Sequence, residues 1–513
     1  MADFDLAVIG GGINGTGIVR DAAGRGLRVL LVEQNDLASG TSSASTKLIH
    51  GGLRYLEHGA FKLVREALIE REVLLRMAPH IIWPMRFVLP PTPGIRSGFI
   101  LRLGLFIYDH LGGRKILPPT RTLDLTHHEV GTPLKRRYRF GFQYSDCWVD
   151  DARLVVLNAV DAAERGAVIR TRTRCVRAER TDLWRLVLND RGRREVVTAR
   201  VLVNAAGPWV GEVSETVVRT PGRSPVRLVK GSHIVVPRLF DHDNAYIFQN
   251  PDGRVVFAIP YQHDFTLIGT TDQDFTGDPA SVAPSPAEIN YLCNTATEYF
   301  RKGIAPVDVV WAYAGVRSLY DDGAAKPEDA TRDYQLMLDD QHREAPLLTI
   351  YGGKITTYRK LAEAAMAKLL HFFAASAPGN ASWTAHAPLP GGDIVLGDIE
   401  TLIAQMRRAR PLLPESLVRR LVRAYGTRID RVIGEATSFE DLGTCFGADL
   451  TAAEVRYLMA HEWAQDADDV LWRRTKLGLR FSSAEHDALS VFMADVSKND
   501  LIKNEASKNK AAT

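Results

Sequence analysis

The chain of 513 residues is too long for one hydrophobic core, and we expect about two to four domains, because a single core rarely exceeds about 250–300 residues. Its composition, with 45% hydrophobic and 24% charged residues, is typical of a globular protein. A formal net charge of +3, without an arginine-rich tract with interleaved aromatic residues, disfavours nucleic-acid binding.

The spacing of the cysteines and the lengths of the apolar runs narrow the possible class of protein further. Cys147, Cys175, Cys293 and Cys445 stand far apart with no CxxC pair, so we expect free thiols and no metal site. The first strand begins near residue 4 with no cationic and apolar signal before it, which predicts a chain that is not exported. No apolar run reaches about 18 residues, so we expect no membrane-spanning helix.

The N-terminal segment has the order of a dinucleotide-binding unit. Residues 4–9 form a short apolar strand that runs into Gly10, Gly12 and Gly15, and a helix and a second strand ending on Glu33 follow. In such a unit the glycines permit a tight turn and close approach of a pyrophosphate, and the acid binds a ribose hydroxyl. The alternative is a glycine-rich turn that only packs a helix onto a sheet.

Residues 81–118 are apolar and aromatic, with single arginines and prolines between them. They follow an amphipathic helix that Pro79 ends. Buried core is the first interpretation of this stretch, and a membrane-surface patch is the second. The candidates for such a patch are the apolar residues Trp83, Phe99, Leu103, Phe106 and Tyr108 and the cations Arg86, Arg96, Arg102, Arg114 and Lys115.

The remaining elements follow in order along the chain. The pattern predicts a helix over 153–164, strands over 167–177, 183–188, 196–203 and 347–351, an antiparallel sheet over 225–275, a linker over 378–392 and helices over 398–492. The last residues, 497–513, lack a core pattern and predict a disordered tail.

Three further segments favour FAD over a nicotinamide cofactor. Hydroxyl groups gather at 41–46, the turn 205–207 contains only Ala and Gly, and the turn 352–357 begins a helix whose positive end suits a flavin. Each is an ordinary turn by itself, but together they suit a long cofactor. The predicted cofactor contacts are Gly10, Gly12, Gly15, Glu33, Thr41, Ser42, Ser43, Ser45, Lys47, Ala206, Gly207, Gly353, Lys354, Thr356 and Thr357.

With these motifs the sequence resembles the aerobic, FAD-dependent glycerol-3-phosphate dehydrogenases. The resemblance rests on residues 10–15, 41–56, 144–153, 230–237, 268–272, 315–317, 352–358 and 472–476, and spans about residues 4–480. Ser318 departs from the family, which has proline after the arginine that matches Arg317. The tail after about residue 493 has no counterpart in the family.

The elements and the resemblance together predict an α/β (α+β) fold. We expect a discontinuous Rossmann-type FAD-binding domain of residues 1–80, 145–215 and 325–380. An antiparallel-sheet substrate or cap domain would comprise residues 81–144 and 216–324. An all-helical C-terminal domain over 390–495 and a disordered tail over 496–513 would complete the chain.

The resemblance implies oxidation of sn-glycerol 3-phosphate to dihydroxyacetone phosphate, with the C2 hydride passing to flavin N5 and the electrons to a membrane quinone. A phosphate dianion needs cationic donors, and Arg54, Arg317 and Lys354 lie in three glycine-flanked segments. Tyr55 and Thr270 complete the predicted substrate-binding set.

The proton on the substrate hydroxyl requires a base, and two histidines have a suitable ordinary pKa. His233 precedes an apolar strand, and His50 precedes a glycine pair beside a predicted flavin segment. We favour His233 as the base and place His50 near the flavin edge. The predicted catalytic set is therefore His233, Arg317 and His50.

Alternatives remain open at this point. An oxidase that uses oxygen, a D-amino-acid or glycine oxidase, and a non-enzymatic flavin-binding protein share the cofactor motifs, although three cations suit a phosphate better than one carboxylate. We expect peripheral, monotopic attachment to the cytoplasmic face of the inner membrane through residues 81–118, and a possible homodimer. The rival membrane site is the C-terminal set Arg407, Arg408, Arg410, Arg419, Arg420 and Arg423.

Overall fold

The computed structural model describes residues 2–57, 59–92, 97–220, 225–321, 323, 333–340, 344–373 and 382–511. The chain divides into two compact units, residues 1–77 with 82–387 and residues 78–81 with 388–513. Within the described ranges, no helix is both long enough and apolar enough to cross a membrane. All four cysteines are free.

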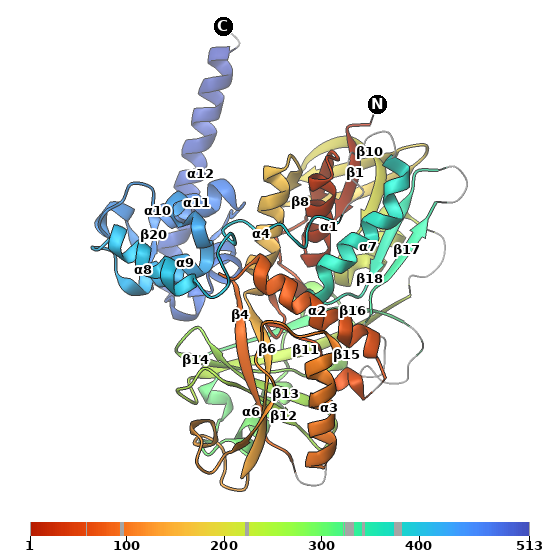
Figure 1. Ribbon diagram of the computed structural model, residues 1–513. Helices are drawn as coiled ribbons and strands as arrows, with labels where there is room; N and C mark the ends of the chain where they lie inside the picture. The colour runs from red at the N-terminus through yellow and green to blue at the C-terminus, as the bar shows by residue number, and fades with distance from the viewer. Residues whose placement is uncertain are drawn as a thin grey trace. The chain divides into compact units, whose positions relative to one another are not determined.

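The larger unit contains an eight-stranded sheet (Figure 1). Its strands run in the order β17 (Gln335–Asp339), β18 (Leu347–Tyr351), β10 (Arg193–Asn204), β1 (Phe4–Ile9), β2 (Val29–Val32) and β7 (Val168–Arg170), with β9 (Trp184–Asp190) and β8 (Thr173–Arg180) joined to β10. Helix α1 (Ile13–Gly24) contacts both α4 (Asp151–Glu164) and α7 (Tyr358–Leu369). Every residue of β2 and β18 is buried, which explains the unbroken apolar run of β2 and the mainly apolar sequence of β18.

The parallel strands bring distant turns to one edge of this sheet. Ile9 lies opposite Asn204 and Val32, and Asn204 lies opposite Thr349. Because β1, β2, β10 and β18 are parallel, the segments that follow them leave from the same side. The glycine turn, Glu33 and the segments after 204 and 351 therefore meet there.

A ten-stranded sheet, mostly antiparallel, forms the rest of the larger unit. Its strands run in the order β15 (Gln273–Asp274), β11 (Val226–Pro237), β14 (Phe265–Gly269), β13 (Val255–Tyr261), β12 (Ala245–Gln249), β4 (Ile82–Leu89), β6 (Phe140–Val149) and β3 (Leu48–Ile49), with β16 (Trp311–Tyr320) on β11 and β5 (Arg121–Asp124) on β6. Helix α6 (Pro286–Tyr299) packs on β11, β13 and β14. Helices α2 (Phe61–Met77), α3 (Gly98–Leu111) and α5 (Val210–Glu212) belong to the same unit.

Strands β11 to β14 confirm the antiparallel sheet predicted over residues 225–275. The division into a FAD-binding and a cap domain stays a prediction, and the two sheets follow it except at β3 and β6. These strands pair with each other in the second sheet, although residues 48–49 and 145–149 were expected in the first domain.

The smaller unit is helical but not all-helical. It contains α8 (Ile399–Ala409), α9 (Glu415–Tyr425), α10 (Ile429–Ile433), α11 (Ala452–His461), α12 (Ser483–Ala511) and a two-stranded sheet of β19 (Cys445–Gly447) and β20 (Leu450–Thr451). Its core includes Leu421, Leu458 and Leu489. The structure shows residues 483–511 as one helix where a tail was expected from 496. Leu489 and Met493 anchor its first turns in this core, and the later alanines and lysines are strong helix formers.

Candidate active site

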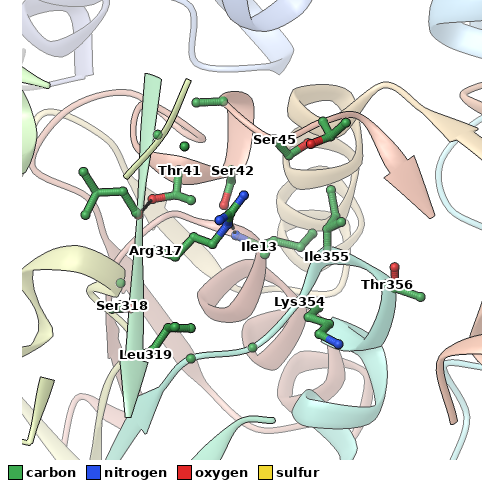
Figure 2. A pocket seen from close by; sticks show the side chains of 18 of the residues that line it. Ile13, Thr41, Ser42, Ser45, Arg317, Ser318, Leu319, Lys354, Ile355 and Thr356 are labelled. Carbon is green, nitrogen blue, oxygen red and sulfur yellow. Dashed lines mark hydrogen bonds between the residues drawn. The ribbon is translucent and has the colours of Figure 1, made fainter. Parts of the chain in front are cut away.

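A cavity of about 630 Å³ lies at the edge of the eight-stranded sheet where the parallel strands end. Both sheets of the larger unit contribute to its wall, and Figure 2 shows side chains that line it from Ile13, from the segment around Thr41–Ser45, from Arg317–Leu319 and from Lys354–Thr356. Sixteen of the predicted site residues line it: Gly10, Gly12, Glu33, Thr41, Ser42, Ser45, His50, Arg54, Tyr55, Ala206, Gly207, Thr270, Arg317, Gly353, Lys354 and Thr356. Gly15, Ser43, Lys47, His233 and Thr357 are not part of the wall.

The glycine turn after β1 forms a cradle that side chains would fill. Gly10 has φ +116°, and a Cβ there would lie 2.4 Å from the Ala205 carbonyl oxygen. A Cβ on Gly15 would lie 2.0 Å from the Gly10 oxygen, so this glycine lets α1 approach β1 and explains why it is absent from the wall. Gly12 lines the cavity at the N-terminus of α1, where the positive end of the helix dipole favours a phosphate.

The Glu33 carboxylate is held beside this turn by two backbone groups. The Gly11 N–H donates to one oxygen at 2.7 Å and the Asn35 N–H to the other at 2.8 Å. Burial raises the pKa of Glu33, and these two hydrogen bonds oppose the shift. The fixed carboxylate keeps further acceptor positions, which suits a ribose diol at the cavity wall.

The hydroxyl-rich segment 41–46 is fastened to the protein by several of its own side chains. The Ser42 hydroxyl accepts from the Ile13 N–H at 3.0 Å, and Thr41 donates to the Val316 carbonyl (Figure 2). Ser45 donates to Asp151 at 2.7 Å. These residues line the cavity, but part of their hydrogen-bonding capacity shapes the segment instead of facing a ligand.

Lys47 occupies a different place from the one predicted. Its ammonium group lies 2.9 Å from both Asp151 oxygens and 2.9 Å from the Ser43 carbonyl, and the side chain is 1% exposed. The ion pair at the start of α4 therefore draws Lys47 behind the segment. Its predicted contact with the cofactor is not supported by this position.

Three cations reach the cavity from three elements. Arg54 and Tyr55 lie in the short turn Leu53–Leu56, and the Lys354 ammonium group lies 3.7 Å from the centroid of the Tyr55 ring. Arg317, on β16, forms an ion pair with Asp272. Asp272 lines the cavity as well, and the sequence analysis assigned it no role.

His50 lies at the cavity wall in a cationic environment. Its backbone N–H donates to the Thr356 hydroxyl at 3.2 Å, and its ring packs edge-on against Phe257. Burial lowers the pKa of His50 to about 3, and the charges of Lys354, Arg71 and Arg317 add to the shift. The imidazole is therefore neutral at neutral pH and has an acceptor nitrogen.

His233 is buried on β11, outside the cavity wall. Its Nε2 lies 3.0 Å from the Thr46 hydroxyl, and its ring stacks on Tyr313 with centroids 4.8 Å apart. Burial, with the charges of Arg317 and Lys47, lowers the pKa of His233 to about 3. This position favours a role in holding Thr46 over the predicted role as the base.

A buried carboxylate that the sequence analysis did not identify lies beneath the turn after β14. Glu288 accepts from the hydroxyl groups of Ser232 at 2.8 Å and Thr271 at 3.0 Å, and pairs with Lys230 at 2.7 Å. Burial alone would raise the pKa of Glu288, but these donors and Ser285 lower it to about 2. Glu288 thus anchors the turn that carries Thr270 and Asp272.

Comparisons with known proteins find relatives over most of the chain. A family model described as FAD dependent oxidoreductase matches residues 5–359, and one described as the C-terminal domain of alpha-glycerophosphate oxidase matches residues 382–501. The chain is 52% identical over 492 residues to a glycerol-3-phosphate dehydrogenase of Pseudomonas aeruginosa, covering 96% of this chain and 95% of the relative. It is 49% identical over 504 residues to the aerobic glycerol-3-phosphate dehydrogenase of Escherichia coli, covering 98% and 99%.

The chain belongs to the FAD-dependent glycerol-3-phosphate dehydrogenase family. It is also 53% identical over 487 residues to a D-erythritol 1-phosphate dehydrogenase of Brucella abortus, covering 94% of this chain and 96% of the relative. The structure of the glycerol-3-phosphate dehydrogenase from Bacillus halodurans complexed with FAD is similar, with a TM-score of 0.73, 28% identity and coverage of 92% and 86%.

Membership of this family confirms the resemblance and the predicted FAD. The fold is the α/β fold of FAD-dependent oxidoreductases, with mixed sheets and a largely helical C-terminal domain. A glycine oxidase from Geobacillus kaustophilus, at a TM-score of 0.56 and 20% identity, shares the fold only. The roles of individual site residues stay predictions.

Proposed function

We propose that this family member oxidises the secondary alcohol next to the phosphomethyl group of a polyol phosphate, with sn-glycerol 3-phosphate as the first candidate. The observation that carries the proposal is the convergence of Arg54, Arg317 and Lys354 on the cavity that also holds the glycine cradle. Bound FAD supplies the hydride acceptor. The protein must then bind the phosphate, orient the alcohol and take its proton.

Each of the three cations would contribute a different interaction to the binding of a phosphate dianion. Arg317 is oriented by Asp272, and a guanidinium can donate two parallel hydrogen bonds to a phosphate. The Lys354 ammonium group, stacked on Tyr55, supplies a second charge, and Arg54 in the neighbouring turn supplies a third. A substrate that carried only a carboxylate would leave part of this charge without a partner.

We assign the proton acceptor to His50 instead of His233. His50 lines the cavity with Lys354 and Thr356, whereas His233 lies behind Thr46. In the free enzyme burial, with the charges of the nearby cations, lowers the pKa of His50 and keeps the imidazole unprotonated. A bound phosphate dianion offsets those charges, and the imidazole then accepts the hydroxyl proton more readily.

D-erythritol 1-phosphate is the second candidate substrate, because the relative that carries this activity in its name is 53% identical to this chain. Both compounds have a secondary alcohol beside a phosphomethyl group, and they differ by one CHOH unit. The cation cluster supports the shared part and does not discriminate between them.

The test is anaerobic loss of the flavin's visible absorbance after addition of each compound. We expect bleaching by glycerol 3-phosphate or erythritol 1-phosphate, with kcat/KM ranking the two, and none by glycerol, erythritol or D-amino acids at equal concentration. Bleaching by an unphosphorylated polyol at the same rate would contradict the proposal.

We further propose that the electrons pass to a membrane quinone while the protein lies on the cytoplasmic face of the membrane. Within the stretch 81–118, β4 is largely buried, whereas α3 exposes an apolar surface, and this exposure supports the proposal. We define the α3 face as Phe99, Ile100, Leu103 and Phe106, which are 50–79% exposed. Ile100 and Leu103 also line the cavity, so this face borders the site.

Only some of the cations predicted beside the α3 face are placed where they could contact lipid headgroups. Arg102 is exposed on α3, whereas Arg86 donates to the carbonyl groups of Pro118 and Pro119 at 3.1 Å, and Arg96 lies outside the described residues. Tyr108 and Trp83 do not belong to the face, since Tyr108 is buried and Trp83 packs against Trp148.

The rival arginines of the smaller unit are largely engaged in ion pairs. Arg419 pairs with Glu400 at 2.8 Å, and Arg420 pairs with Asp449 at 2.5 Å and Glu454 at 2.7 Å. Paired charges attract anionic headgroups weakly, so we favour the α3 face.

Vesicle flotation distinguishes the two surfaces. We expect Leu103→Glu/Phe106→Glu to lose flotation and quinone reduction while retaining turnover with a soluble dye. Arg407→Gln/Arg408→Gln on α8 is the matched control, since it also lowers the net charge by two units. If the α3 variant still floated with vesicles, the α3 face would be excluded as the membrane-binding surface. If the enzyme passed electrons to oxygen as fast as to a quinone, an oxidase would be favoured over a quinone-linked dehydrogenase.

A further inference from the structure

Tyr108 connects the buried side of α3 to the backbone beside His50. The Gly51 N–H donates to the Tyr108 hydroxyl at 2.8 Å, and that hydroxyl donates to the Asp146 carboxylate, 2.8 Å and 2.9 Å from its two oxygens. Tyr108 and Asp146 are each 2% exposed, and neither lines the cavity. They form a layer behind its wall.

The direction of these hydrogen bonds is determined by the chemistry of the partners. Arg71, on α2, lies 2.5 Å from Asp146 and keeps the buried carboxylate compensated, and its guanidinium carbon lies 5.7 Å from the centroid of the Tyr108 ring. Burial raises the pKa of Asp146, and the charge of Arg71 and its hydrogen bond oppose that shift. With Asp146 ionised in this pair, the carboxylate only accepts, so the Tyr108 proton points to Asp146. The phenol oxygen is then free to accept from Gly51.

The same layer holds His50 through consecutive backbone groups. The His50 N–H donates to Thr356 and the Gly51 N–H donates to Tyr108. On the preceding side, Ile49 of β3 pairs with Cys147, the residue after Asp146. Gly51 packs so closely that a Cβ would lie 2.8 Å from the Tyr108 ring, which leaves the backbone little room to move.

We propose that Tyr108, supported by Asp146 and Arg71, is a positioning residue that holds the His50 imidazole in the orientation needed to accept the substrate proton. The inference rests on the proposed function of His50. Tyr108 touches neither substrate nor cofactor in this arrangement, and it acts through the backbone of Gly51, whose N–H donates to the Tyr108 hydroxyl and also interacts with the Asp146 carboxylate. Its contribution is therefore to the rate of the chemical step and not to substrate binding.

The experiment compares Tyr108→Phe with the wild-type FAD holoenzyme by anaerobic rapid mixing with glycerol 3-phosphate. We expect flavin reduction to slow by about 10- to 100-fold, the usual loss when a catalytic group is misplaced by up to about 1 Å, with KM changed by less than about 3-fold. A crystal structure of Tyr108→Phe should show the His50 ring displaced, which is a readout independent of turnover.

Tyr246→Phe is the matched control. The Tyr246 side chain is equally buried, and its hydroxyl makes two hydrogen bonds, to the Val130 carbonyl at 2.6 Å and to His242 at 2.8 Å, but it does not line the cavity. We expect this variant to lose thermal stability and keep the wild-type rate. An equal loss of rate in both variants would mean that the hydroxyl groups act on the fold, and would overturn the inference.

A double variant separates this inference from the proposed function. In His50→Asn, adding Tyr108→Phe should produce no further loss of rate, because the second change acts only through His50. A further 10-fold loss in that background, or a wild-type rate in Tyr108→Phe when His50→Asn is slow, would overturn the inference and leave the function of His50 intact. A wild-type rate in His50→Asn itself would overturn both the inference about Tyr108 and the proposed role of His50 as proton acceptor.

Should Tyr108→Phe fail to retain FAD, 3-fluorotyrosine in place of Tyr108 nearly keeps the packing, weakens the oxygen's capacity to accept from Gly51 and strengthens the donation of the hydroxyl to Asp146. The expected result is a decrease of about 2- to 5-fold in the rate of flavin reduction with full FAD content. An unchanged rate in this variant would also overturn the inference.

Discussion

The glycine turn after β1 and the cation cluster of Arg54, Arg317 and Lys354 line the same cavity, but they are built differently. The turn presents backbone groups from one short segment, and Gly12 contributes by having no side chain. The cluster presents side chains from three distant elements, and Arg317 and Lys354 are each held by a partner of their own. We therefore expect the turn to lose its function when a substitution adds a side chain. The cluster should lose its function when a substitution removes one.

Gly12→Val should have the largest effect. A Cβ at this position would already lie 3.1 Å from the Ser42 hydroxyl, and the larger side chain would occupy the space of the pyrophosphate. We expect a folded protein that purifies without FAD, measured by the ratio of flavin to protein absorbance. Glu33→Ala removes a side-chain contact and should only weaken FAD retention. A full flavin complement in Gly12→Val would place the cofactor elsewhere.

His50→Asn should lower the rate of flavin reduction by about 10²- to 10⁴-fold, the usual contribution of a general base. Protonation of the substrate phosphate should lower the wild-type kcat/KM below about pH 6, because the cations bind the dianion. Because the pKa of His50 is lowered to about 3, protonation of His50 should add a second, steeper fall only in more acidic solution. The second fall should disappear in His50→Asn, and the fall caused by the phosphate should remain. A larger loss in His233→Asn than in His50→Asn would restore the original assignment of the base.

Arg317→Ala should reduce kcat/KM for glycerol 3-phosphate by an amount equivalent to about 2–5 kcal/mol, since it removes a charged partner from a desolvated anion. Arg54→Ala tests the neighbouring turn in the same way. Oxidation of glycerol, where detectable, should change much less. Equal losses on both substrates would show that the arginine supports the flavin or the fold.

Glu288→Gln should give the smallest effect on activity and a pH-dependent effect on stability. Because the pKa of Glu288 falls from an ordinary 4.5 to about 2 on folding, its carboxylate stabilises the fold by about 3 kcal/mol above pH 4.5. This contribution is lost as the pH falls from 4.5 towards 2. Thermal unfolding at pH 7 and pH 3 should show the gap between the wild type and the variant narrowing, and a constant gap would contradict this role.

Local patterns in the sequence were sufficient to predict the glycine turn after β1 and the position of Glu33 beside it. The spacing of Gly10, Gly12 and Gly15 and the acid at Glu33 require a defined backbone path, so sequence neighbours are also neighbours in space. The two-residue period over 225–275 predicted the antiparallel strands for the same reason. Membership of the family, and with it FAD, was also readable from motifs that span the chain.

The tertiary structure alone decided which side chains face the cavity. Hydrophobic periodicity reports that a residue is buried but not what it contacts, and Lys47 meets Asp151 across 104 positions of sequence. For the same reason the sequence could not rank His50 above His233 or identify Glu288 and Tyr108 behind the wall. It also left residues 81–118 ambiguous, because β4 and α3 are equally apolar. Strand pairing buries most of β4, whereas α3 has one side packed on the protein and leaves the α3 face exposed.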